Sequence, residues 1–416
     1  MQLHRSLRQN HLATAFLVCA WFFPTFSLAQ TNFTVQTTPN PNVHGNTLNA
    51  IAAISSTDVW AVGYRNDNNL NESRTLIQHW DGVAWKTVAS PNPASTKACS
   101  GANTGNYLTA VSAASPTDIW AVGLMFTCSS LLKPLALHWD GLKWRKVKTP
   151  ALNTNDNAAF NGVLAFASNN VYAVGYQPAT NGAVLTLIEH WNGTSWSVIP
   201  SPNGNSTGNV LAGISATSPT DIWAVGDMVA PSTPVKTLVE HFDGVQWSIV
   251  PSPNPLPTGS LNQNVLTCVQ ANSANDATAV GFLRNLNTQT VTTLVEHWDG
   301  VQWSVVASPN RSETAGSFNT LKSVSGTSGN NLYAVGFFAN SQTGGQQRTM
   351  VEHFDGAAWN IINSPTQGVA QQLNGAFASH TSSELWAVGA FSANQTDPET
   401  GFLIVPKTLV LYSPTR

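Results

Sequence analysis

The sequence predicts an all-β protein, a seven-bladed β-propeller with four antiparallel strands per blade and an N-terminal strand that completes the last blade. Three observations carry this prediction. A unit of constant design recurs along the chain, each copy holds four short strand-like runs, and the two ends hold partial units that add up to one whole.

Three markers return in the same order in six copies of the repeat, and the last copy holds only the first marker. The first is a run ending in Ala-Val-Gly, the second is a His-Trp or His-Phe pair before Asp-Gly or Asn-Gly, and the third is a Trp five residues beyond that aromatic. Successive copies lie roughly 50 to 60 residues apart, a period typical of propeller blades. The Ala-Val-Gly runs begin at Asp58, Asp118, Asn170, Asp221, Asp276, Asn331 and Glu384.

Each copy reads as four strands. Typical members are "LNAIAAI" from Leu48, "WAVG" from Trp60, "TLVEHW" from Thr293 and "WSVV" from Trp303. These runs are short, rich in β-branched and aromatic residues, and free of helical periodicity. Asp-Gly or Asn-Gly between the third and fourth runs favours a tight hairpin, since both residues tolerate positive φ. "SPNP" ends the fourth run because proline cannot donate to a strand ladder.

The two ends of the repeat array complement each other. The last unit runs through "ELWAVG" and "TLVLYSPTR" to Arg416 without a fourth strand, whereas Asn32–Thr38 resembles an isolated fourth strand with Phe33 in the Trp position. We therefore expect the N-terminal strand to cover an otherwise unpaired edge of the last blade. The predicted repeats cover residues 32–41 together with 373–416, and then 48–93, 108–150, 160–203, 211–255, 265–310 and 321–366.

Residues 1–29 are predicted to be a signal peptide, with Arg5 and Arg8 before an apolar run and small residues up to Ala29. Lipoprotein cleavage before Cys19 and retention as an anchor are the alternatives. Charged residues make up only 9% and the net charge is −3, so no basic field is present for nucleic acid or an anionic membrane. We expect a monomer that is secreted, periplasmic or on the cell surface, with no membrane span after signal cleavage.

Four cysteines are present, and three remain once Cys19 leaves with the signal peptide. Cys99 and Cys128 both fall in long connections around the second repeat, and we predict a disulfide between them, as an oxidising compartment permits. Cys268 occupies a small-residue position of a first strand and is expected to be an inert buried thiol.

"LYAVG" followed by "VEHFDGAAWNIINSP", from Leu332 onward, resembles a Kelch repeat, with a Tyr, a Gly-ended strand, a turn and a Trp-started strand. The resemblance covers all seven units, although the Kelch double glycine is single here. The pattern is also similar to uncharacterised repeat proteins exported by bacteria. It implies a propeller and little about activity, because a fold does not determine a function.

Six histidines recur at one position: His79, His138, His190, His241, His297 and His353. A shared metal site is not expected, because the third strand lies about 10 Å outward from the central one and zinc needs its nitrogens at about 2.0–2.1 Å. We interpret the histidines as structural, bonded to backbone or to the Asp58-type residue, similar to the Asp-His networks of WD propellers. The repeated Glu and Trp positions are interpreted as architecture too, and no metal or cofactor is expected.

Binding residues are expected where the repeats differ. The turns after first and third strands are short and uniform, whereas the connections after second and fourth strands are long and irregular and share one end of the blades, here called the varied end. Residues leaving the second strands there are candidates for a rim that binds a sugar or peptide, with simple packing beneath the loops as the alternative. The candidate ligand-binding residues are Tyr64, Arg65, Tyr176, Asp227, Phe282 and Phe337.

The sequence favours an exported, non-catalytic binding or scaffold propeller that presents loops of one face to a protein or glycan. The alternative is an extracellular enzyme on the same scaffold, acting on a polysaccharide or oxidising a small alcohol as Kelch-type copper oxidases do. Such oxidases combine a tyrosine near a cysteine with histidines, and the tyrosines here show no such grouping in sequence. No catalytic residue is identified.

Overall fold

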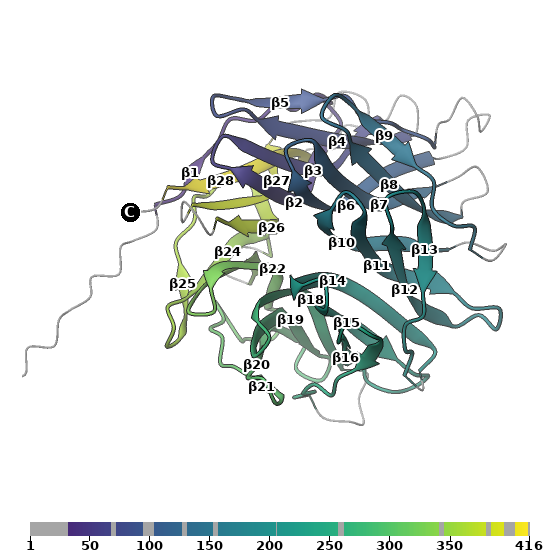
Figure 1. Ribbon diagram of the computed structural model, residues 1–416. Coiled ribbons are helices and arrows are strands. Elements are labelled where there is room, and N and C mark those ends of the chain that lie inside the picture. Colours follow the sequence, from purple (N-terminus) through teal and green to yellow (C-terminus); the bar gives the residue numbers. More distant parts are fainter. Residues whose placement is uncertain are drawn as a thin grey trace, which may run out of the picture. The chain divides into compact units, whose positions relative to one another are not determined.

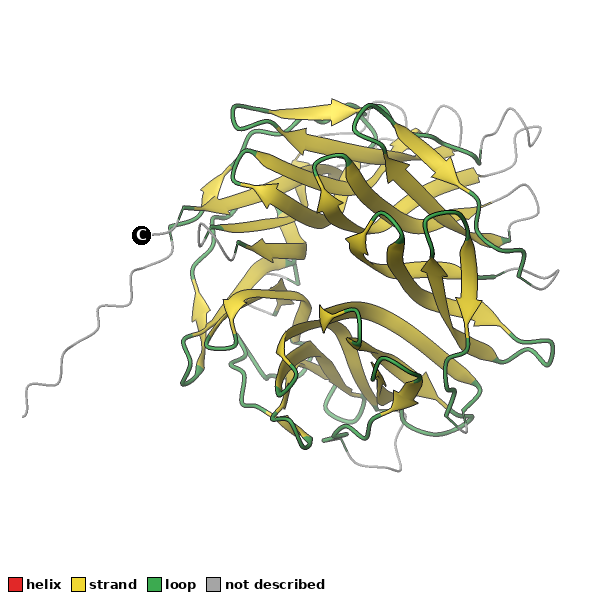
Figure 2. Cartoon of the chain, in the orientation of Figure 1, coloured by secondary structure: helices red, strands yellow, loops and turns green. Residues whose placement is uncertain are grey.

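The computed structural model describes residues 32–67, 72–94, 104–126, 131–152, 157–204, 206–256, 262–340, 345–379, 384–394 and 404–414. They belong to one compact unit, Thr31–Arg416. These residues form strands and no helix (Figure 2), so the all-β prediction is confirmed. No helix in the described part is long and apolar enough to cross a membrane.

The strands group into four-strand modules, named here by the position of each strand in its module (Figure 1). The first strands are β2 (Asn46–Ser55), β6 (Thr104–Ser115), β10 (Ala159–Ala167), β14 (Gly208–Ser218), β18 (Gln263–Ser273), β22 (Phe318–Ser328) and β26 (Ala370–Ala378). The second strands are β3 (Asp58–Asp67), β7 (Asp118–Phe126), β11 (Asn170–Pro178), β15 (Asp221–Val229), β19 (Asp276–Asn285), β23 (Asn331–Ala339) and β27 (Leu385–Asn394).

The third strands are β4 (Glu72–Trp80), β8 (Leu132–Trp139), β12 (Val184–Trp191), β16 (Lys236–Phe242), β20 (Thr290–Trp298), β24 (Arg348–Phe354) and β28 (Ile404–Ser413). The fourth strands are β5 (Trp85–Val88), β9 (Trp144–Val147), β13 (Trp196–Ile199), β17 (Trp247–Ile249), β21 (Trp303–Val305), β25 (Trp359–Ile362) and, for the last module, β1 (Thr34–Val35). Several first strands begin a few residues before the Leu that the sequence pattern marks, as β2 does at Asn46.

Within a module the strands pair antiparallel in the order first, second, third, fourth, as β2-β3-β4-β5 does. The third-to-fourth hairpin shows why Asp-Gly is used there. Gly82 takes a φ of 87°, which a glycine adopts at no steric cost. Asp81 Oδ1 accepts hydrogen bonds from the backbone N–H groups of Val83 and Ala84, so the aspartate caps the turn while the glycine turns the chain.

Every pairing of a first with a second strand contains a β-bulge at the same place. In β2 the register shifts between Leu48 and Ala50, and in β22 it shifts between Leu321 and Ser323. The residue inside the shift, Asn49 or Lys322 in these cases, has no partner in the ladder. A bulge bends its strand and redirects the side chain of the extra residue. Each module therefore has one such residue in its first strand.

The first strands contact one another in chain order, β2 with β6, β6 with β10 and so on, and β26 contacts β2. The last module is completed by the N-terminal segment, because Thr34 pairs with Tyr412 and Val35 with Leu411. Figure 1 shows purple β1 beside yellow β28. The strand is shorter than the predicted Asn32–Thr38.

Short parallel pairings also join β4 to β6, β12 to β14 and β20 to β22. Nothing in the repeat pattern predicts them. They link neighbouring modules beyond the contacts of the first strands.

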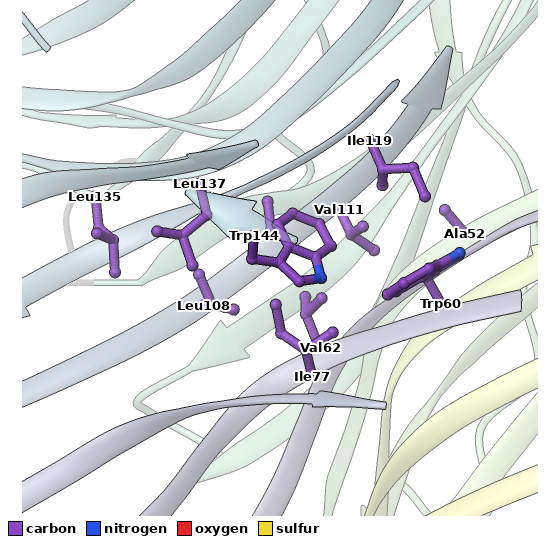
Figure 3. Packing of buried hydrophobic residues seen from close by; sticks show 11 residues of the cluster. Ala52, Trp60, Val62, Ile77, Leu108, Val111, Ile119, Leu135, Leu137 and Trp144 are labelled. Atoms are coloured by element: carbon purple, nitrogen blue, oxygen red, sulfur yellow. The ribbon is translucent and has the colours of Figure 1, made fainter. Parts of the chain in front are cut away.

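The hydrophobic core lies between the faces of neighbouring modules. One cluster combines Trp60 and Ile77 of one module with Leu108 and Trp144 of the next (Figure 3). The Trp60 and Trp144 rings meet edge to face with centroids 5.7 Å apart. Burying such large apolar side chains contributes roughly 1.5–3 kcal/mol each, so packing against its neighbours stabilises each module.

Candidate functional site

Each of the six repeated histidines pairs with the Asp or Asn that begins the second strand of its own module. Asp58 Oδ1 accepts a hydrogen bond of 2.9 Å from Trp60 Nε1 and lies 2.8 Å from His79 Nε2. The Trp60 and His79 rings stack with centroids 4.2 Å apart. The other pairs are His138 with Asp118, His190 with Asn170, His241 with Asp221, His297 with Asp276 and His353 with Asn331.

These pairs tie the third strand to the start of the second strand of the same module, so the histidines do not converge on one point. Across the described residues, no group of three His, Cys, Asp or Glu side chains could hold a metal ion. In two modules Asn replaces Asp, and there burial lowers the pKa of His190 and of His353. An amide supplies no negative charge to favour the imidazolium.

Four glutamates precede histidines in the third strands and are fully buried: Glu189, Glu240, Glu296 and Glu352. Burial raises the pKa of each to about 8. Ser201 donates to Glu240 and Ser308 donates to Glu352, each at 2.7 Å. Among the described residues, the Glu189 and Glu296 carboxyls have no hydrogen-bond partner. These four acids are therefore neutral parts of the core near pH 7.

The candidate ligand residues of the second strands occupy equivalent places. The five candidates that directly follow the Ala-Val-Gly glycine each face a threonine of the third strand, as Tyr64 faces Thr75, whereas Arg65 faces Arg74. All six candidates are half-buried. Tyr64 and Arg65 share β3, whereas the others lie on β11, β15, β19 and β23: Tyr176, Asp227, Phe282 and Phe337. The structure thus spreads them over several modules.

Tyr64 contributes to packing between modules. Its ring lies 4.8 Å, centroid to centroid, from Tyr107 of β6, and the Tyr107 hydroxyl donates to Ser73 Oγ at 2.8 Å. At another module, burial raises the pKa of Asp227 to about 6. Of the cysteines, Cys99 and Cys128 lie outside the described residues, while Cys268 is a free thiol.

A central cavity of about 160 Å³ is lined by every first strand, including Cys268. The bulge residues of these strands reach it: Asn49, Thr109, Asn161, Ala212, Thr267, Lys322 and Asn374. Sequence reasoning missed this cavity. The available signal was Lys322, which carries the one charge at a position otherwise held by Asn, Thr and Ala.

Most bulge residues donate to the backbone of the next module. Asn49 Nδ2 donates to the Leu108 carbonyl at 2.8 Å, and Asn374 Nδ2 donates to the Leu48 carbonyl at 2.9 Å. Three more such bonds join neighbouring modules: Thr109 to Phe160, Asn161 to Leu211 and Thr267 to Leu321. This set of five bonds, here called the inner belt, links first strands side chain to backbone. Ala212 and Lys322 are the bulge residues outside it.

No protein-family model matches the chain, and no curated protein matches it in sequence. Solved structures do resemble it. One described as "YCF48 bound to D1 peptide" is 12% identical with a TM-score of 0.50, covering 94% of this chain and 98% of that one. "Structure of U3-55K" is 10% identical with a TM-score of 0.53, covering 92% and 98%. "Crystal structure of RRP9 WD40 repeats" is also 10% identical at 0.53, covering 92% and 97%. At such identities the likeness shows the fold alone, and that fold is the β-propeller.

Proposed function

We propose that this chain is an exported seven-bladed propeller that acts as a non-catalytic binding or scaffold module. The modules are its blades, β1 completes the last blade, and residues 1–29 direct export. Its ligand is a protein segment or a glycan held at the varied end.

The difference between the two ends of the modules carries this proposal. Connections from third to fourth strands keep one length and one design, as Asp81–Ala84 and Asp243–Gln246 do. Connections at the varied end differ from module to module, from Leu286–Gln289 between β19 and β20 to the stretch 306–317 between β21 and β22. Diversified loops on a rigid repeated scaffold are where recognition surfaces are built.

Exposed apolar and aromatic groups at the varied end support a ligand that stacks or packs. Leu286 and Phe318 remain 39% and 41% exposed, and the Arg311 guanidinium lies 5.6 Å from the Phe338 ring centroid. Aromatic faces suit both sugar rings and apolar peptide side chains. A similar propeller is described as bound to a peptide, which makes a protein segment the first ligand to test.

The test uses the chain without residues 1–29 on a peptide array and a glycan array. Leu286→Ser and Phe318→Ser alter the varied end. Val83→Ser and Leu142→Ser are matched controls, because these exposed apolar residues lie in hairpins at the opposite end. We expect the first pair to weaken capture about tenfold and the controls to leave it unchanged. Equal losses from both pairs, or no capture on either array, would contradict the proposal.

Export is tested separately, by fractionating cells that produce the full chain. The mature protein should appear in the medium or the envelope, with an N-terminus near Gln30. Retention of the intact chain in the cytoplasm would contradict the proposal that the protein is exported. The proposal that it binds a ligand would still be decided by the array experiment.

A further inference from the structure

Lys322 is the exception among the bulge residues. It sits inside the register shift of β22, between Leu321 and Ser323, and lines the central cavity. The corresponding residues of the other first strands are neutral. A lysine at this position therefore places a positive charge where the other modules place an amide, a hydroxyl or a methyl group.

Among the described residues, this charge has no counterion. No aspartate or glutamate lines the cavity, and Lys322 makes no ion pair or hydrogen bond with a described residue. Burial lowers the pKa of its ammonium group. Lys322 is only partly exposed to solvent, and partial removal of an unpaired charge from water is unfavourable, so an anion beside the ammonium would be stabilised.

The rest of the wall supplies neutral donors. Asn49, Asn161 and Asn374 each use one Nδ2 hydrogen in the inner belt, and an amide nitrogen carries two hydrogens. The belt thus holds these side chains in position while a second N–H of each remains for a ligand. Ala212 lines the cavity as well and adds no polar group to it.

We propose that the central cavity binds a small oxyanion, of the size of phosphate or a short carboxylate, with the Lys322 ammonium as its charged partner and asparagine amides as neutral donors. The volume of about 160 Å³ exceeds the roughly 10–15 Å³ that one water molecule needs on this measure, so a polyatomic anion fits. This site is separate from the varied end, and neither proposal depends on the other.

Thermal unfolding with added anion tests the site, because a ligand that binds only the folded state raises the melting temperature. Sodium phosphate and sodium acetate form two arms, each compared with sodium chloride at equal ionic strength. The variant is Lys322→Met, which keeps the length of the side chain without its charge. The matched control is Lys236→Met, at an exposed lysine of β16.

We expect phosphate or acetate to raise the melting temperature of the wild type and of Lys236→Met, and titration calorimetry to show at least tenfold weaker binding to Lys322→Met. The arm that responds identifies phosphate or carboxylate as the ligand class. Equal shifts in Lys322→Met and wild type, or no shift from either anion in the wild type, would overturn the proposal.

A second measurement on the wild type does not depend on folding of the variant. In protein with ¹³C-labelled lysine, the pKa of Lys322 should rise when the binding anion is added, since a nearby negative charge favours the ammonium. Burial also lowers the pKa of Lys146, but that residue does not line the cavity, and its pKa should stay unchanged. An unchanged pKa of Lys322 at saturating phosphate and acetate counts against the site.

Discussion

Thr34 is the antiparallel partner of Tyr412, a contact between residues 378 positions apart. The pairing is reinforced on both sides. Gln36 donates its backbone N–H to the Val410 carbonyl at 2.9 Å, and Asn40 Oδ1 accepts the Thr408 N–H at 2.8 Å. Phe33 lies in one buried cluster with Leu409 and Leu411. The N-terminal segment thus covers the edge of β28.

Deleting Asn32–Thr38 should strongly lower the melting temperature or cause oligomers, because the edge of β28 would be left unpaired. The milder Phe33→Ala should cost about 3–5 kcal/mol, as truncation of a buried Phe usually does. Urea unfolding and light scattering measure both effects. Thr37→Ala, at an exposed neighbour, is the control and should change little; an unaltered melt of the deletion would refute this role of β1.

The buried glutamates make stability depend on pH. The pKa of Glu296 is raised by burial from its usual 4.5 to about 8. The stability that the protonated Glu296 contributes is therefore fully present below pH 4.5 and is lost as the pH rises through 8. The reason is that the unfolded chain loses this proton at a lower pH than the folded chain does. Glu296→Gln stays neutral at all pH values.

We expect Glu296→Gln to become more stable relative to the wild type as the pH rises from 5 to 8. Urea titration measures this as the difference between their free energies of unfolding. Glu313→Gln, at an exposed glutamate, should show no such gain. A difference between Glu296→Gln and wild type that is the same at both pH values would be inconsistent with a neutral buried acid.

Asn170, the partner of His190, carries no charge that would favour the protonated form of the imidazole. Asn170→Asp places a carboxylate at the atom now 2.9 Å from His190 Nε2, and an opposite charge at that range favours the protonated ring. The pKa of His190 should rise by about one unit or more, and NMR titration of the imidazole measures this change. Asn181→Asp adds the same charge in the loop at the far end of β12 and should leave it nearly unchanged; equal shifts would rule out the local pairing.

The core between modules depends on aromatic contacts across the interface. Trp144→Ala should cost about 3–5 kcal/mol through loss of buried surface and the cavity left behind. A double-mutant cycle with Trp60→Ala should return a coupling of about 0.5–1.5 kcal/mol, because the two rings meet edge to face. Chemical unfolding measures each term, with Val83→Ala as the exposed control. Strict additivity would mean that the two rings do not interact energetically.

Much of the architecture could be read from the sequence because it is encoded locally and repeated. Each Asp-Gly hairpin, each Ala-Val-Gly strand and each Asp58-type residue recurs at a constant spacing, so one interpretation applies to every copy. The placement of Phe33 beside the last module also followed from the pattern, since two partial units imply one shared sheet.

Tertiary structure alone decided the rest. Tyr64 meets Tyr107 of the next module, and the inner belt and the central cavity arise only when bulge residues from strands spread over the whole chain face a common centre. A sequence pattern records which residue occupies each repeat, but whether Lys322 has a counterion depends on what every other module contributes to the same wall. The repeated residues of the chain therefore determined the scaffold, because each acts within its own module. The packing of the modules determined which residues meet at the central cavity, because those residues come from different first strands.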